Sequence, residues 1–246
     1  SDFVPTGRYN YAQSVAVQPD GKIVLLGGMM DDNAKGQIAL ARFNPDSSLD
    51  KSTFGTNGKG TVTAAVPTFY YHDSSLTLQA DGKIVVAGTV SDVDDIYHDL
   101  VVARFNSNGS LDTSFGGTGI VTTDLGNNEN ANDVLVQLDG KIVIVGNTSN
   151  ASASDIVIMR YNSDGSLDNS FGVNGKVIND FGNTSDSANR AVIQTGKLLM
   201  VGSSNGNAIL ARYYLDASKF HPTTVSFQSN ARYDGCGCRR SSPNHT

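Results

Sequence analysis

The chain contains no tryptophan, and its only two cysteines, Cys236 and Cys238, lie close to the C-terminal end. Disulfide bonds therefore contribute nothing to the main body of the protein. Charged residues make up only 17% of the chain, and the net charge is −6, with scattered basic residues. A nucleic-acid ligand requires a basic face that displaces counterions from phosphate, so nucleic acid is excluded as a partner. Apolar runs such as residues 142–146 are too short to cross a bilayer as helices.

A charged-then-apolar leader is missing at Ser1, so if the protein is exported we expect this chain to be a mature or trimmed form. Low charge, 26 glycines and many Asn, Ser and Thr residues favour a secreted or cell-surface β-protein. The hydrophobic content of 39% is enough to bury the core of one domain.

A short hairpin with a Lys after its turn recurs four times, at residues 14–28, 75–88, 133–146 and 190–202. The turn lysines Lys22, Lys83, Lys141 and Lys197 are 61, 58 and 56 residues apart. A strand-rich repeat of this period predicts a radially repeated all-β architecture.

Each repeat continues in the same way after its hairpin. A polar loop leads to a third strand, a turn-rich stretch follows, and a fourth strand ends the unit. We therefore predict an all-β β-propeller of four-stranded antiparallel blades, with four repeats of about 52–62 residues. The predicted blades lie in one domain, residues 1–228, at roughly 12–66, 74–125, 132–182 and 189–228. Residues 1–11 are expected to help ring closure, and 229–246 to be a flexible or non-native tail.

Every third strand ends with an arginine followed by an aromatic residue. We expect the aromatic to fill the space between blades and the arginine to neutralise a turn carboxylate. The four pairs are Arg42 with Phe43, Arg104 with Phe105, Arg160 with Tyr161 and Arg212 with Tyr213.

The combined DGK, ARFN, GSLDxSFG and GxG pattern resembles the delta-60 repeat, also described as the DUF5122-type β-propeller repeat of bacterial secreted and surface proteins. The resemblance covers roughly residues 12–228. Thr195 replaces the turn Asp, the first repeat lacks the GSLD glycine, and the fourth lacks SFG. The resemblance implies four-stranded blades around an axis and says little about activity. We expect a closed monomer, with an open fragment or a ring completed by two chains as alternatives.

Antiparallel blades place alternate connections on opposite faces. The turn face carries the DGK turns and GSLDxSFG stretches, whose similarity between repeats indicates a structural role. The loop face carries the connections that differ between repeats, and we expect any site there because binding loops commonly vary on a rigid scaffold.

One part of the loop face is rich in polar and aromatic side chains. Its candidate binding residues are Asp31, Asp32, Tyr70, Tyr71, His72, Asp73, Tyr97 and His98. Its candidate metal ligands are Asp92, Asp94, Asp95 and Asp99, for a divalent cation such as Ca²⁺. A solvated acidic loop with exposed tyrosines explains the same residues without a ligand.

The stretches 106–112 and 162–168 place oxygen-bearing side chains at alternate positions, as calcium loops do. A bidentate acid at the EF-hand offset is missing from both stretches. We therefore interpret them as Asx-turns, with Asp50, Asp112 and Asp168 capping the turn that carries SFG.

These features favour a non-catalytic binding or scaffold module that presents its loop face to a carbohydrate or protein. The alternative is a hydrolase or lyase that uses His72, His98 and Asp95, with or without a metal ion, at the propeller mouth. A third alternative is one piece of a larger array without its own activity.

Overall fold

The computed structural model describes residues 10–30, 36–55, 59–66, 69–91, 98–150, 153–182, 185–216 and 223–226. These residues form sixteen strands in four antiparallel four-stranded sheets, each with its strands in chain order. The first sheet holds β1 (Asn10–Val17), β2 (Ile23–Met30), β3 (Gly36–Phe43) and β4 (Thr61–Ala65). The second holds β5 (Phe69–Leu78), β6 (Ile84–Ser91), β7 (His98–Phe105) and β8 (Ile120–Thr123).

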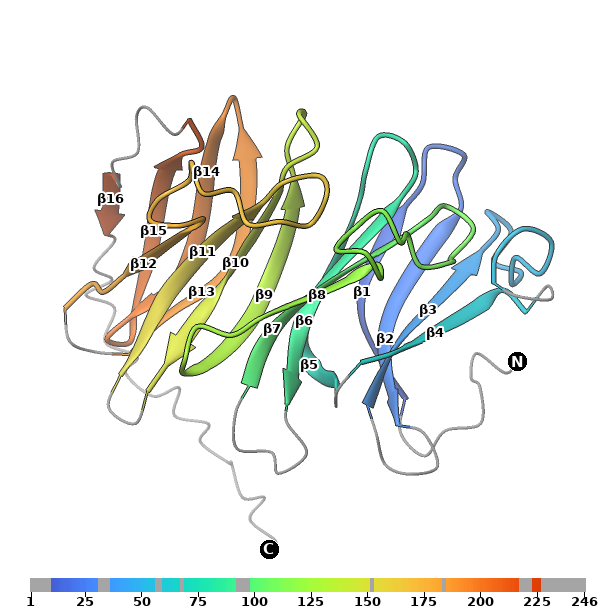
Figure 1. Ribbon diagram of the computed structural model, residues 1–246, viewed down its shortest axis with the longest axis horizontal. Coiled ribbons are helices and arrows are strands. Elements are labelled where there is room, and N and C mark those ends of the chain that lie inside the picture. The colour runs from blue at the N-terminus through green and yellow to red at the C-terminus, as the bar shows by residue number, and fades with distance from the viewer. Residues whose placement is uncertain are drawn as a thin grey trace, which may run out of the picture.

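The third sheet holds β9 (Asn128–Val136), β10 (Ile142–Ser149), β11 (Ser154–Tyr161) and β12 (Lys176–Asn179). The fourth holds β13 (Asp186–Gln194), β14 (Lys197–Ser204), β15 (Asn207–Tyr214) and β16 (Thr223–Ser226). Figure 1 shows these sheets fanned side by side, as blades of a propeller are. The expected all-β class and the four-stranded antiparallel blades are confirmed. In the described part of the chain, no helix is long and apolar enough to span a membrane.

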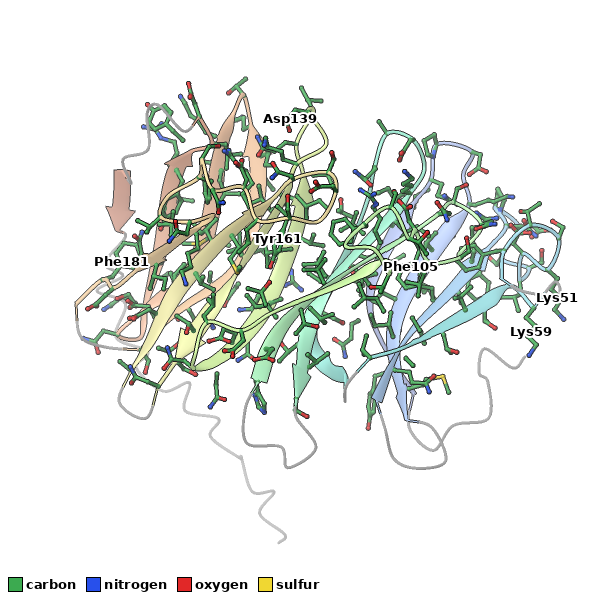
Figure 2. The ribbon with its side chains drawn as sticks, in the orientation of Figure 1. Lys51, Lys59, Phe105, Asp139, Tyr161 and Phe181 are labelled. Atoms are coloured by element: carbon green, nitrogen blue, oxygen red, sulfur yellow. The ribbon has the colours of Figure 1, made fainter. Side chains whose placement is uncertain are left out.

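The core lies between neighbouring sheets rather than within any one of them. Three hydrophobic clusters join the first sheet to the second, the second to the third, and the third to the fourth. Strands β6 and β10 are sandwiched on both faces, so their apolar residues are buried almost throughout. The aromatics Phe105 and Tyr161 are fully buried between blades (Figure 2), which confirms their expected role.

The expected closed ring is not what the structure shows. Among the described residues, no hydrophobic cluster joins the first sheet to the fourth. These two sheets lie at opposite ends of an arc in Figure 1. Phe43 in the first sheet is accordingly only half-buried, whereas Phe105, Tyr161 and Tyr213 are fully buried. Four similar repeats fix the geometry within and between blades, but not whether the last blade meets the first.

A β-bulge interrupts the first strand of the blades at the same register. The pairing shifts between Ala12 and Ser14 in β1, and between Ala188 and Arg190 in β13, with equivalent irregularities in β5 and β9. A glycine of the second strand lies opposite. A Cβ on Gly146 would lie 1.9 Å from the carbonyl oxygen of Asn130, so no side chain fits there. The equivalent glycines of the first, third and fourth blades, Gly27, Gly146 and Gly202, thus make room for the bulged backbone.

Candidate functional site

The turn face is held together by a buried ionic cluster in each of the first three blades. In the third blade, Asp168 Oδ2 accepts a hydrogen bond from Arg160 Nε at 2.7 Å and lies 3.0 Å from Lys141 Nζ. Ser170 caps the other oxygen, Oδ1, through both its backbone N–H and its hydroxyl. The equivalent groups are Asp50 with Arg42 and Lys22, and Asp112 with Arg104 and Lys83.

These contacts confirm the expected arginine–carboxylate pairs and the Asx-turns in three repeats. Burial alone would raise the pKa of Asp112, but hydrogen bonds from Ser114 and the charge of Arg104 lower it to about 2. The hydrogen bonds of Ser52 and Lys22 likewise hold the pKa of Asp50 far below its usual range, against the opposing effect of burial. A carboxylate ionised throughout the physiological range has a structural role here rather than acid–base work.

The same arginines connect each blade to the next. Arg42 Nη1 donates to the carbonyl oxygen of Ser107, and Arg104 Nη1 to that of Ser163, both at 2.5 Å. Arg160 Nη1 donates to the carbonyl oxygen of Leu215 in the fourth blade. The fourth blade departs from this pattern, because Arg212 Nε is buried without a hydrogen-bond partner. The hydrogen bond from Nε to a turn carboxylate, present in the first three blades, is thus missing at Arg212.

The predicted loop-face residues are only partly within the described structure. Asp31, Asp32, Asp92, Asp94, Asp95 and Tyr97 lie outside the described residues. Tyr70, Tyr71, His72 and Asp73 belong to β5, where the structure describes their backbone alone. His98 begins β7, and its backbone N–H donates to Asn128 Oδ1 at 3.2 Å. The proposed gathering of these side chains therefore remains a prediction.

Asp99 lies in a carboxylate cluster that the sequence did not reveal. Oxygens of Asp99, Asp124 and Glu129 lie within 4.8 Å of one another. The next pair of blades repeats the cluster at the equivalent register with Asp155, Asp180 and Asp186. In each cluster, two members come from one blade and the third from the first strand of the next blade. These are the described residues that could hold a divalent cation.

A polar cleft of about 520 Å³, which we call the axial cleft, lies between the first strands of the four blades. Neighbouring first strands contact one another along the arc. The cleft is lined by Gln13, Ser74, Asn130, Asn132, Asn147, Ser187, Asn189 and Arg190. These side chains offer amides, hydroxyls and one guanidinium, so they can bind a polar ligand through many hydrogen bonds.

The bulges explain why these side chains converge. Gln13, Asn132 and Asn189 each lie at the register shift of their own strand, and Ser74 is the equivalent residue of the second blade. A bulge re-aims a side chain that a regular strand would direct into the sheet stack. One bulged residue from every blade therefore faces the same cleft.

Hydrogen bonds between blades fix the walls of the axial cleft. Ser75 Oγ donates to Asp133 Oδ1 at 2.9 Å, and the other oxygen of Asp133 accepts from the backbone N–H of Ala191 at 2.8 Å. Asn132 Nδ2 donates to the carbonyl oxygen of Ala188 at 2.5 Å. Ser74 is different, since it is only 5% exposed and its Oγ has no hydrogen-bond partner. The cleft is thus preformed, and Ser74 Oγ is the buried side-chain atom without a partner among its described lining residues.

The sequence contained a signal for this site, because a polar residue precedes the first strand core of every repeat. These residues are Gln13, Ser74, Asn132 and Asn189. We predicted a binding site on the loop face because its loops differ between repeats. The axial cleft is instead built from equivalent positions of the repeats, which carry similar polar side chains.

Comparison with known proteins supports the fold. The family described as "Domain of unknown function (DUF5122) beta-propeller" matches residues 18–52, 79–115 and 137–171. No curated protein matches the chain. A PL25 polysaccharide lyase, an ulvan lyase, has a similar structure both in complex with -[GlcA(1-4)Rha3S]- and in a second structure, with TM-scores of 0.54 and 0.53. Each alignment has 12% identity and covers 89% of this chain and 56% of the lyase.

A GH43_1 enzyme from Xanthomonas citri complexed with xylotriose is a weaker match. Its TM-score is 0.45 at 9% identity, over 91% of this chain and 74% of the enzyme. The chain spans little more than half the length of the lyase. At these identities the likeness shows the propeller fold alone.

Proposed function

Because the chain belongs to the DUF5122 β-propeller repeat family, we propose that it is a binding module without catalytic activity that takes a carbohydrate in its axial cleft. The observation that carries the proposal is the convergence of one polar bulge residue from each of four blades on a single cleft. Asn, Gln and Ser side chains both donate and accept hydrogen bonds, as neighbouring hydroxyl groups of a sugar require. A secreted or cell-surface location would suit this role.

Ser74 supports the proposal most specifically. A buried hydroxyl without a partner costs free energy unless something satisfies it. Ser74 lines the cleft, but its Oγ is covered, so a hydroxyl group of a bound sugar would reach Oγ and remove that cost only after the neighbouring lining shifts. Arg190, the one charged residue among the described lining residues, would favour saccharides that also carry an acidic group.

The chemistry of the lining favours binding over hydrolysis or elimination. Glycoside hydrolysis commonly uses two carboxyl groups, and general acid–base catalysis needs a group that titrates near the working pH. Among the described lining residues there is no Asp, Glu or His. The hydrolase or lyase alternative depends on His72, His98 and Asp95. The binding experiment below also tests it, because cleavage of the saccharide would be detected there.

A glycan array that contains neutral, uronic and sulfated oligosaccharides would test the proposal, followed by calorimetry on each binder. We expect binding without cleavage of the saccharide. Ser74→Ala removes a cleft hydroxyl without breaking an internal hydrogen bond, so it should weaken binding by about 2- to 10-fold. Ser163→Ala, an exposed serine on the turn face, is the matched control. Release of shorter or unsaturated products would instead establish the enzyme alternative.

A further inference from the structure

We propose that Asp155, Asp180 and Asp186 form a Ca²⁺ site at the boundary between the third and fourth blades. Asp155 is in β11, Asp180 follows β12, and Asp186 begins β13. Oxygens on these three residues lie within 4.8 Å of one another. Ligands on one Ca²⁺ ion, at 2.3–2.6 Å from it, are separated by up to about 5 Å. The spacing therefore fits a shared ion.

Asp186 provides an observation beyond the cluster of acids. It is fully buried, and its Oδ2 accepts a hydrogen bond from the backbone N–H of Phe181 at 2.7 Å. Its Oδ1 is also buried and has no hydrogen-bond partner. A buried carboxylate oxygen without a donor needs a compensating positive charge, because its desolvation is otherwise uncompensated. A cation among the three aspartates would supply that charge.

In the equivalent cluster between the second and third blades, the buried carboxylate already has hydrogen-bond partners on both oxygens. Glu129 Oε1 accepts hydrogen bonds from Asn127 N–H and Thr148 Oγ1, and Oε2 accepts one from Leu125 N–H. The longer Glu side chain reaches donors that Asp186 does not contact. We therefore assign the ion to the Asp155 cluster and use the Asp99 cluster as an internal control.

Ca²⁺ suits this site better than Mg²⁺. The ligands are hard carboxylate oxygens, and exposed Asp180 leaves one side open to water molecules that complete a large, irregular coordination shell. Burial, together with the negative charges of Asp180 and Asp186, raises the pKa of Asp155. This repulsion between carboxylates is what a divalent cation would relieve.

Calcium titration of the EDTA-dialysed protein by calorimetry, with thermal melts in parallel, tests this site. We expect one equivalent of Ca²⁺ to bind, a rise in Tm, and weaker binding of Mg²⁺. Asp155→Asn, with Asp180→Asn as a second variant, should raise the dissociation constant for Ca²⁺ at least about tenfold. Asp99→Asn should leave it unchanged. Absence of calcium-dependent heat and stabilisation in the parent chain, or equal loss in Asp99→Asn, would overturn the proposal.

The two ends of the arc carry a second, independent inference: we infer that the fourth blade of one copy packs on the first blade of another. Strands β13–β15 of the fourth blade bear an apolar groove with Val192, Leu199, Val201 and Leu210 among its lining residues. Val192 is 59% exposed and Val201 48% exposed. Repeat alignment places these four residues at the positions of Leu135, Val143, Val145 and Ile158 in the third blade.

In the third blade, those positions form the interface with the next blade. Val143, Val145 and Ile158 are fully buried against the fourth blade, and Leu135 packs beside them. The fourth blade therefore repeats an established interface surface that no further blade covers among the described residues. Large exposed apolar surfaces of this kind usually mark an interaction site.

The first blade offers the complementary surface. Val15 and Val17 are 59% and 65% exposed. They align with Ala191 and Ile193, which pack against the third blade. The exposed face of the fourth blade is thus equivalent to a surface that the following blade covers elsewhere in the arc. The exposed face of the first blade is equivalent to a surface that the preceding blade covers. Two copies joined head to tail at both ends would close a ring of eight blades with two-fold symmetry, within the range of known propellers.

Light scattering after size exclusion, from micromolar to near-millimolar protein, tests this arrangement. We expect a mass near twice 25.9 kDa at high concentration. Val201→Asp and Val17→Asp should each raise the dissociation constant at least about tenfold, since both faces are required. Val173→Asp, 72% exposed on the turn face, should have no effect. A monomer at every concentration would overturn the inference, as would a dimer that Val17→Asp leaves unchanged.

Discussion

The turn face and the axial cleft are both rich in polar side chains, but their hydrogen-bonding states differ. On the turn face, Asp50, Asp112 and Asp168 are each bonded to an arginine and a lysine from their own blade. In the axial cleft, Ser74 is buried with an unsatisfied hydroxyl. Recurrence of polar residues therefore does not distinguish a scaffold from a binding site. Both regions contain buried side-chain atoms without partners, since Gln79 Oε1 and Gln137 Oε1 lie on the turn face. The distinction lies in the ion pairing of the turn-face carboxylates and in the concave shape of the cleft that Ser74 lines.

The largest expected effect comes from breaking a turn-face cluster. Asp168→Ala leaves Arg160 and Lys141 without their carboxylate, and removal of one partner from a buried ion pair costs about 3–5 kcal/mol. Urea unfolding should report this loss of stability. The Ser163→Ala control should change stability by less than about 0.5 kcal/mol. Equal stabilities for the two variants would mean that the cluster does not support the scaffold.

A smaller loss of stability is expected from a substitution at Gly146, where the second strand of the third blade lies against the bulge that shapes the cleft. Gly146→Ala would place a methyl group 1.9 Å from the carbonyl oxygen of Asn130, which forces the two strands apart. Overpacking of this kind typically costs about 1–3 kcal/mol. Thermal unfolding measures the cost, and an unchanged Tm would show that the bulge is not constrained by this contact.

Acid should weaken the turn face through the same carboxylates. The pKa of Asp112 is lowered from 3.8 to about 2 on folding. Its contribution to the free energy of unfolding is therefore complete above pH 3.8 and is lost as the pH falls towards 2. Asp50 and Asp168 shift in the same direction. Urea midpoints between pH 5 and 2 should therefore fall less steeply for Asp112→Asn than for the parent chain. Parallel curves would contradict this role.

The smallest effect is expected in the fourth blade. Arg212 Nε is buried without a partner, so Arg212→Met removes an uncompensated polar group and should leave stability nearly unchanged. Arg160→Met removes the partner of Asp168 and should destabilise strongly. Parallel urea unfolding of the two variants gives the difference, and similar losses would show that the fourth blade retains the interaction.

Much of the fold followed from local patterns in the sequence. The recurring DGK turns and third-strand segments predicted the strands, and the recurring arginines predicted pairing with a turn carboxylate, which is Asp112 for Arg104. Ring closure was predicted wrongly, because it depends on angles between blades that add up over the whole arc. The missing GSLD glycine of the first repeat has a physical reason. A Cβ on Gly109 would lie 2.9 Å from Phe54 of the preceding blade, whereas no described blade precedes Ser47.

The candidate sites were less predictable than the fold. The axial cleft depends on bulges whose backbone must fit against glycines such as Gly146, which is a contact between strands and not a local pattern. The carboxylate clusters combine residues from two blades, so no local motif in the sequence connects Asp99 with Asp124 and Glu129. Asp99 was identified as a candidate ligand, but its partners were not.

Glycan binding by three chains measured side by side tests the central claim most directly. The parent protein, Ser74→Ala and Ser163→Ala differ by one hydroxyl group in the axial cleft or on the turn face. The account predicts that Ser74→Ala weakens saccharide binding by about 2- to 10-fold while Ser163→Ala leaves it unchanged. Saccharide binding that both variants retain in full, or no saccharide binding by the parent protein, would contradict the account.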